Sequence, residues 1–95
     1  MATRERPVDV GIRRAATIVS TLGNEIHEAR LQRGLSQDSL TKATGMPQAK
    51  VSLIERHLLV GASIEDFARL FAVVGMQLSA KAYPGGTLVR DIAQR

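Results

Sequence analysis

The chain has 95 residues, of which 44% are hydrophobic and 23% charged, a balance typical of one compact domain and unlike that of disordered chains. Thirteen Lys and Arg against nine Asp and Glu give a net charge of +4, which favours an anionic partner. The absence of cysteine excludes a disulfide framework and a thiolate zinc site, and two phenylalanines, one tyrosine and no tryptophan argue against a stacking platform for single-stranded nucleic acid.

Nothing in the sequence indicates a membrane or secretory segment. The longest apolar run, 70–76, is far shorter than the roughly 20 residues that a membrane-spanning helix needs. The segment 15–19 is too short for the core of a secretory signal and has polar neighbours. We therefore expect a cytoplasmic chain with no membrane partner.

The first expected helix follows a short polar segment. Residues 1–8 are interpreted as a flexible basic arm, and the domain proper is expected over 9–75. Asp9 is a candidate N-cap for the helix and Gly34 a candidate C-terminal stop. A break into two helices near 20–23 is nearly as well supported. Apolar residues at alternating spacings of three and four define one helix face, namely Ile12, Ala15, Val19, Leu22, Ile26 and Ala29.

Two short helices are expected next, each with its own boundary signals. Ser36 can cap a helix over 37–44, which Gly45 closes. Pro47 opens the following helix, which runs to about Arg56.

A last helix is expected over 64–74. Ser63 and Asp66 have the spacing of a capping box, with Asp in place of the usual Glu, and Gly75 ends the helix. A broad apolar stripe along it comprises Ile64, Phe67, Leu70, Phe71 and Val74.

After Gly75 the period of the pattern changes from helical to two. Apolar residues alternate with polar ones over 76–83, which predicts a half-buried strand. A turn at 84–86 and a helical stub over 87–95 are expected to follow. Because no other segment has a strand pattern, this strand needs a partner from a second copy of the chain. We therefore predict a homodimer through 76–95, with an antiparallel strand pair at its centre.

The stretch 35–56 contains the residues that indicate a function. It predicts two helices joined by a tight turn at Gly45, where glycine supplies the positive φ that the turn needs. The side chains that would hold the helices together are Leu40, Met46, Val51 and Ile54. The side chains that would face outward on the second helix are Gln48, Ala49, Lys50, Ser52 and Leu53. Amide, basic and small side chains of this kind can read base edges in the major groove, although they would also suit a solvated helix surface.

These residues resemble those of the lambda-repressor-like, Cro/cI-type helix-turn-helix proteins. The resemblance covers about 22–75 and is specific when its pieces are taken together. The matching pattern is Glu25-Ile26-x3-Arg30-x3-Gly34-Leu35-Ser36-Gln37, then Leu40 and Gly45, then Gln48-x2-Val51-Ser52-x-Ile54-Glu55-Arg56. It implies an all-α fold, a small helical bundle with a central helix-turn-helix at 36–57, to which the C-terminal β-strand would be an addition.

The resemblance also implies roles for individual residues. Base contacts are implied for Gln48, Ala49, Lys50, Ser52 and Leu53. Phosphate contacts are implied for Ser36, Gln37 and Arg56, where a helix N-terminus also favours an anion. A structural salt bridge is implied between Arg30 and Glu55.

Four positions depart from the family pattern. Pro47 stands where Ser or Thr usually caps the recognition helix, and Leu53 stands where Arg, Lys or Gln is frequent. Thr41 replaces a small alanine at the helix crossing, and His57 replaces the glycine that customarily ends the recognition helix.

The expected function is therefore sequence-specific binding of double-stranded DNA by a transcriptional regulator with a palindromic operator. The alternative is a protein-interaction module, such as the antitoxin of a toxin–antitoxin pair or the docking part of a larger regulator. No arrangement of residues supports an enzyme. No cofactor is expected, and no metal site, because His27 and His57 lack a second ligand at helical spacing.

Overall fold

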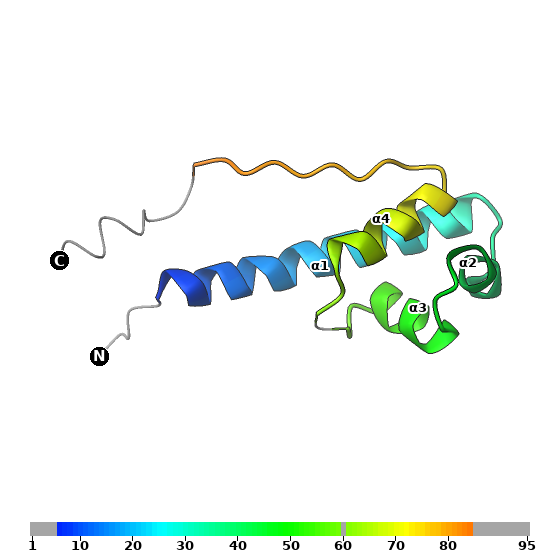
Figure 1. Cartoon of the computed structure of the whole chain (residues 1–95), viewed down its shortest axis with the longest axis horizontal. Coiled ribbons are helices and arrows are strands. Elements are labelled where there is room, and N and C mark those ends of the chain that lie inside the picture. Colours follow the sequence, from blue (N-terminus) through cyan, green and yellow to red (C-terminus); the bar gives the residue numbers. More distant parts are fainter. Residues whose placement is uncertain (1–5, 60, 85–95) are drawn as a thin grey trace.

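The computed structural model describes residues 6–59 and 61–84, and within these ranges every regular element is an α-helix. The helices are α1 (Pro7–Gln32), α2 (Gln37–Thr44), α3 (Gln48–Glu55) and α4 (Ile64–Val73). Figure 1 shows α1 as a long rod, with the three shorter helices gathered around its C-terminal half. No helix in the described part of the chain is long and apolar enough to cross a membrane.

Helix α1 begins earlier than the sequence predicted. Its N-cap is Arg6, and Pro7 occupies the first helical turn, where its preset φ fits and its missing N–H is not needed. Asp9 is therefore not the N-cap; it lies within the first turn and pairs with Arg6, at 2.8 Å from Nε to Oδ2. The expected arm 1–8 is correspondingly too long, and residues 1–5 lie outside the described part.

The core is made by one face of each helix. Its members are Ile26, Ala29, Leu40, Met46, Val51, Ile54, Phe67, Leu70, Phe71 and Val74. Burying these side chains removes apolar surface from water, which is the main force that holds such a bundle together. All four residues that were predicted to lock the helix-turn-helix belong to this core.

The predicted apolar face of α1 continues beyond the core, so only its C-terminal part is buried. Ile12 is 68% exposed, and Ala15 is exposed as well, whereas Ile26 is fully buried. The reason is length: 26 helical residues extend about 39 Å, but helices of 8 to 10 residues extend only about 12–15 Å. Ile64 is also exposed, at 72%, because it is the first residue of α4 and lies at the edge of the core.

Helix α1 is continuous through Gly23, so the alternative break at 20–23 is not present. Gly23 is buried where α1 meets the end of α3: a Cβ placed on it would come within 2.2 Å of the carbonyl oxygen of Ile54. The two helices can approach this closely only because residue 23 has no side chain.

Two matched glycine substitutions in α1 are expected to have opposite effects. Gly23→Ala should lower the free energy of unfolding by about 1–3 kcal/mol, since the backbone of α3 must move away. Gly11→Ala should raise it by about 1 kcal/mol, because a Cβ there meets nothing within 4 Å and alanine favours the helix. Thermal or urea unfolding of both variants checks this pair, and a stabilised Gly23→Ala variant would contradict the helix contact.

The predicted caps of α2 and α4 are confirmed. Ser36 Oγ accepts a hydrogen bond from the backbone N–H of Ser39 at 3.0 Å. Ser63 and Asp66 form a reciprocal capping box, with both donor–acceptor distances at 3.0 Å. These bonds satisfy N–H groups that have no partner inside the helix, and they fix where each helix starts.

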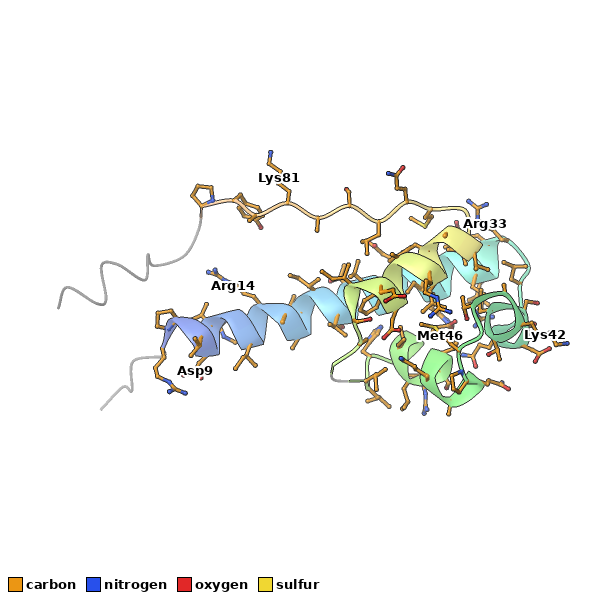
Figure 2. All side chains as sticks on the ribbon, in the orientation of Figure 1. Asp9, Arg14, Arg33, Lys42, Met46 and Lys81 are labelled. Atoms are coloured by element: carbon orange, nitrogen blue, oxygen red, sulfur yellow. The ribbon has the colours of Figure 1, made fainter. Side chains whose placement is uncertain are left out.

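The strand predicted over 76–83 is not present among the described residues. Residues 76–84 have no regular secondary structure, because no other described segment offers a strand to pair with. They run back beside the N-terminal half of α1 (Figure 1). Leu78 packs against the core. Figure 2 shows Arg14 on the side of α1 towards this segment and Lys81 pointing away from the helix. The expected turn at 84–86 and the stub over 87–95 lie outside the described residues, apart from Pro84.

Candidate nucleic-acid interface

The turn between α2 and α3 is held by several contacts. Gly45 closes α2 with a φ of 77°, and Met46 is buried, pointing into the interior between the helices (Figure 2). Thr44 is buried and central: its Oγ1 donates to the carbonyl of Leu40 at 2.6 Å and accepts from the backbone N–H of Met46 at 3.2 Å. The guanidinium of Arg69, from α4, donates to the carbonyl of Thr44. Contacts from within the motif and from α4 thus hold the turn, and with it the angle between α2 and α3.

Thr41, one of the departures from the family pattern, lies in α2. In the described part of the chain, its Oγ1 is the buried side-chain polar atom that has no hydrogen-bond partner. A buried hydroxyl without a partner is unfavourable, and an alanine at this position would avoid that cost.

Helix α3 has one anchored face and one accessible end. Val51 and Ile54 are fully buried, and they seat the helix on the core. Gln48 and Ala49, in the first turn, are exposed, whereas Ser52 and Leu53 are only partly exposed. The accessible end of α3 therefore consists mainly of its first turn.

Lys50 is on the same helix, but its ammonium is engaged within the protein. Nζ lies 3.2 Å from Oδ1 and 3.1 Å from Oδ2 of Asp66, in the first turn of α4. The backbone N–H of Ser63 and, to a smaller extent, Lys50 hold the pKa of Asp66 below its ordinary value, against the opposing effect of burial. The sequence predicted Asp66 only as a cap; that it also binds Lys50 depends on how α3 and α4 pack.

The three residues with implied phosphate contacts lie away from the first turn of α3: Ser36 and Gln37 are at the start of α2, and Arg56 is at the end of α3. Ser36 caps α2 and is exposed, and Gln37 Nε2 donates to Glu55 Oε1 at 3.4 Å, which brings the start of α2 to the end of α3. Arg56 is exposed next to Glu55 and donates from Nε to the carbonyl of Ser52 at 3.4 Å. Gln37 thus contacts a buried carboxylate, and Arg56 is the residue that follows it in the chain.

That carboxylate belongs to an ion pair between α1 and α3. Arg30 Nε donates to Glu55 Oε2 at 2.8 Å and Arg30 Nη2 donates to Glu55 Oε1 at 2.9 Å, a two-pronged geometry. Only 1% of the Glu55 side chain and 11% of the Arg30 side chain are exposed. Arg30 Nη1 also donates to the carbonyl of Leu35 at 2.9 Å. The resemblance implied this pair; the structure places it at the join between the first helix and the end of α3.

Sequence reasoning missed a third member of this cluster. His27 Nδ1 lies 2.7 Å from Glu55 Oε1. His27 precedes Arg30 by three residues and so lies on the same side of α1, which was the available signal. Burial by itself would raise the pKa of Glu55, but hydrogen bonds from Arg30, His27 and Gln37 outweigh it and hold that pKa below its ordinary value.

Helix α3 ends at another departure from the family pattern, His57. The backbone N–H of Leu58 donates to the carbonyl of Leu53 at 2.8 Å, and that of His57 donates to Ile54 at 3.1 Å, which is a Schellman motif. The residue at its centre needs a positive φ. Gly34 and Gly75 fill this place after α1 and α4, but after α3 it is His57, with a φ of 63°.

His57→Gly is therefore expected to stabilise the protein. Glycine adopts this backbone conformation without steric cost, and the expected gain in the free energy of unfolding is about 0.5–1 kcal/mol after the added chain entropy is subtracted. Urea unfolding measures it, with His57→Ala as the control that keeps the steric cost. Equal stability of the two variants would contradict strain at this position.

In the part of the chain that the structure describes, no group of three or more His, Cys, Asp or Glu side chains is placed to hold a metal ion. The helix-turn-helix instead presents amide and methyl groups on the first turn of α3, and exposed basic and hydroxyl groups at the end of α3 and the start of α2. Comparison of the chain with protein-family models, with curated proteins and with solved structures gives no match.

Proposed function

We propose that this chain is a helix-turn-helix domain of the lambda-repressor-like kind that binds double-stranded DNA and regulates transcription, without catalysis. In this proposal the first turn of α3 enters the major groove, where Gln48 pairs with a base edge and Ala49 contacts a thymine methyl. Ser52 and Leu53 flank the contact, while Ser36, Gln37 and Arg56 meet the phosphate backbone. Such a protein would work in the cytoplasm, at the nucleoid.

One observation carries this proposal. The fully buried side chains of Val51 and Ile54 hold one face of α3 against the core, while Gln48 and Ala49 remain accessible at its N-terminal end. A helix that reads bases must be held rigidly on one side and be free on the other, because misplacing hydrogen-bonding groups removes their ability to discriminate. The contacts around Thr44 add the fixed angle between α2 and α3.

Selection of bound sites from a pool of random duplex DNA at physiological salt tests the proposal. We expect a consensus sequence, and affinity for it should fall steeply with salt because each neutralised phosphate contributes about −0.9 to the slope of log K against log salt concentration. Equal, weak binding to every duplex would contradict sequence-specific recognition.

We further propose that two copies bind as a homodimer through the segment 76–83. The support is its alternating pattern together with the absence of a paired strand in the described part of the chain, which leaves this backbone open to pair with a second copy. The selected site should then be palindromic, with half-sites about 34 Å apart or a multiple of that distance. A monomer in sedimentation at micromolar concentration contradicts the dimer.

A second candidate function is a protein-interaction module such as an antitoxin. The observation in its favour is that two apolar residues one helical turn apart in the N-terminal half of α1 remain accessible, Val8 at 63% and Ile12 at 68% exposed. A neighbouring, co-transcribed gene for a small toxin-like protein would favour it. Ile12→Asp should then abolish the complex with that protein and leave DNA binding unchanged.

A further inference from the structure

The ion pair between Lys50 and Asp66 joins α3, the helix that we propose enters the major groove, to α4. Lys50 occupies the third position of α3, from which a side chain of its length could reach a groove or a phosphate. Its ammonium instead lies within 3.2 Å of both carboxylate oxygens of Asp66. The Lys50 side chain is 38% exposed and that of Asp66 only 13%.

Asp66 is the fixed member of this pair. Its Oδ2 accepts the backbone N–H of Ser63 at 3.0 Å, and its own backbone N–H donates to Ser63 Oγ, so the carboxylate is bound to the helix start that it caps. Lys50 has a long, flexible side chain and reaches across from α3 to meet it. Any movement that separates the pair must therefore be made by Lys50.

We infer that Asp66 is a positioning residue that holds the ammonium of Lys50 on α4 and away from DNA. This inference rests on the proposed function, and it says which residues give that function its sequence specificity. Gln48 and Ala49 contact the bases, while Lys50 stays bound to Asp66 when the protein binds its preferred site. Releasing Lys50 adds a cationic contact that increases affinity for any duplex more than it increases discrimination between sequences.

Four proteins test this inference on the selected duplex and on a scrambled duplex: the unchanged chain, Asp66→Asn, Lys50→Ala and the double variant. Asn keeps a carbonyl oxygen that can accept the N–H of Ser63, so the helix cap remains. Lys50→Ala alone is expected to change affinity less than threefold. Asp66→Asn should bind both duplexes about tenfold more tightly, with a salt slope steeper by about 0.9, the value for one more neutralised phosphate.

The double variant separates release of Lys50 from the loss of a negative charge near DNA. If Lys50 is the group that Asp66 holds back, the double variant binds within threefold of Lys50→Ala. A tenfold gain from Asp66→Asn that persists in the Lys50→Ala background contradicts the inference, and so does a tenfold loss in Lys50→Ala alone. Asp66→Gln, with the amide that is common at this capping-box position, replaces Asp66→Asn if that variant unfolds.

Failure of this inference is distinguishable from failure of the proposed function. If the unchanged chain binds DNA and Asp66→Asn gains nothing, only the role of Asp66 is wrong. If neither protein binds any duplex, the proposed function is wrong and the inference with it. The ion pair has its own readout without DNA: in an NMR titration, Lys50→Ala should raise the pKa of Asp66.

Discussion

Replacing Glu55 by alanine is expected to lower the free energy of unfolding by about 3–5 kcal/mol, which is the cost of leaving a buried charge without its partner. Glu55 is almost completely buried and accepts two hydrogen bonds from Arg30, which is itself buried. Without the carboxylate, the guanidinium keeps only the carbonyl of Leu35 among these acceptors. A small domain is stable by only about 5–15 kcal/mol, so the variant should unfold at a much lower temperature.

Two controls show whether this loss comes from the pair. Glu28→Ala removes an exposed carboxylate from α1 and should change stability by no more than about 0.5 kcal/mol. Replacing Arg30 and Glu55 together by leucine should cost less than Glu55→Ala alone, since neither charge is then left unpaired. If the double variant loses as much stability as Arg30→Leu and Glu55→Leu lose together when each is measured alone, the two residues act independently.

The same carboxylate gives a pH dependence with a defined sign. The pKa of Glu55 in the folded protein lies below its ordinary value of 4.5, so its stabilising contribution is present above pH 4.5 and is lost as the pH falls through the folded pKa. Below pH 4.5 the unfolded chain binds more protons than the folded one, and stability should decline. Glu55→Gln should flatten this decline in urea unfolding between pH 5 and pH 3.

Replacing Gln48 by alanine is expected to reduce discrimination between the preferred site and a scrambled duplex by about 1–3 kcal/mol. The amide of Gln48 is exposed in the first turn of α3 and can donate and accept one hydrogen bond each with an adenine. Affinity for the scrambled duplex should change little, because that binding comes from phosphate contacts. Titrations of both duplexes at one salt concentration give the two affinities.

Gln77→Ala is the matched control for Gln48→Ala. Gln77 is also an exposed glutamine, but it lies in the segment 76–84, on the opposite side of the bundle from α3 in Figure 1. The proposed pairing of two copies through this segment uses backbone N–H and C=O groups, which the substitution leaves intact, so both affinities should be unchanged. If the two variants behave alike, α3 is not the helix that contacts the bases.

The sequence by itself predicted the caps of α2 and α4, the turn at Gly45 and the buried sides of α2 and α3. Ser36 and Ser63 cap helices because their hydroxyls accept backbone N–H groups within the next turn, and Gly45 ends α2 because only a residue tolerant of positive φ fits there. The buried set of α2 and α3 followed from helical spacing. These features depend on residues within a few positions of one another, so a pattern in the chain is sufficient to find them.

The tertiary structure decided which of those residues remain available. Helical spacing placed Ile12 and Ile26 on one face of α1, but only the packing of three shorter helices buries Ile26 and leaves Ile12 in solvent. Lys50 and Asp66 are 16 positions apart, and nothing near either residue predicts their ion pair. A spacing rule describes one helix at a time, whereas burial and charge pairing depend on which other helix lies opposite, at what height and angle.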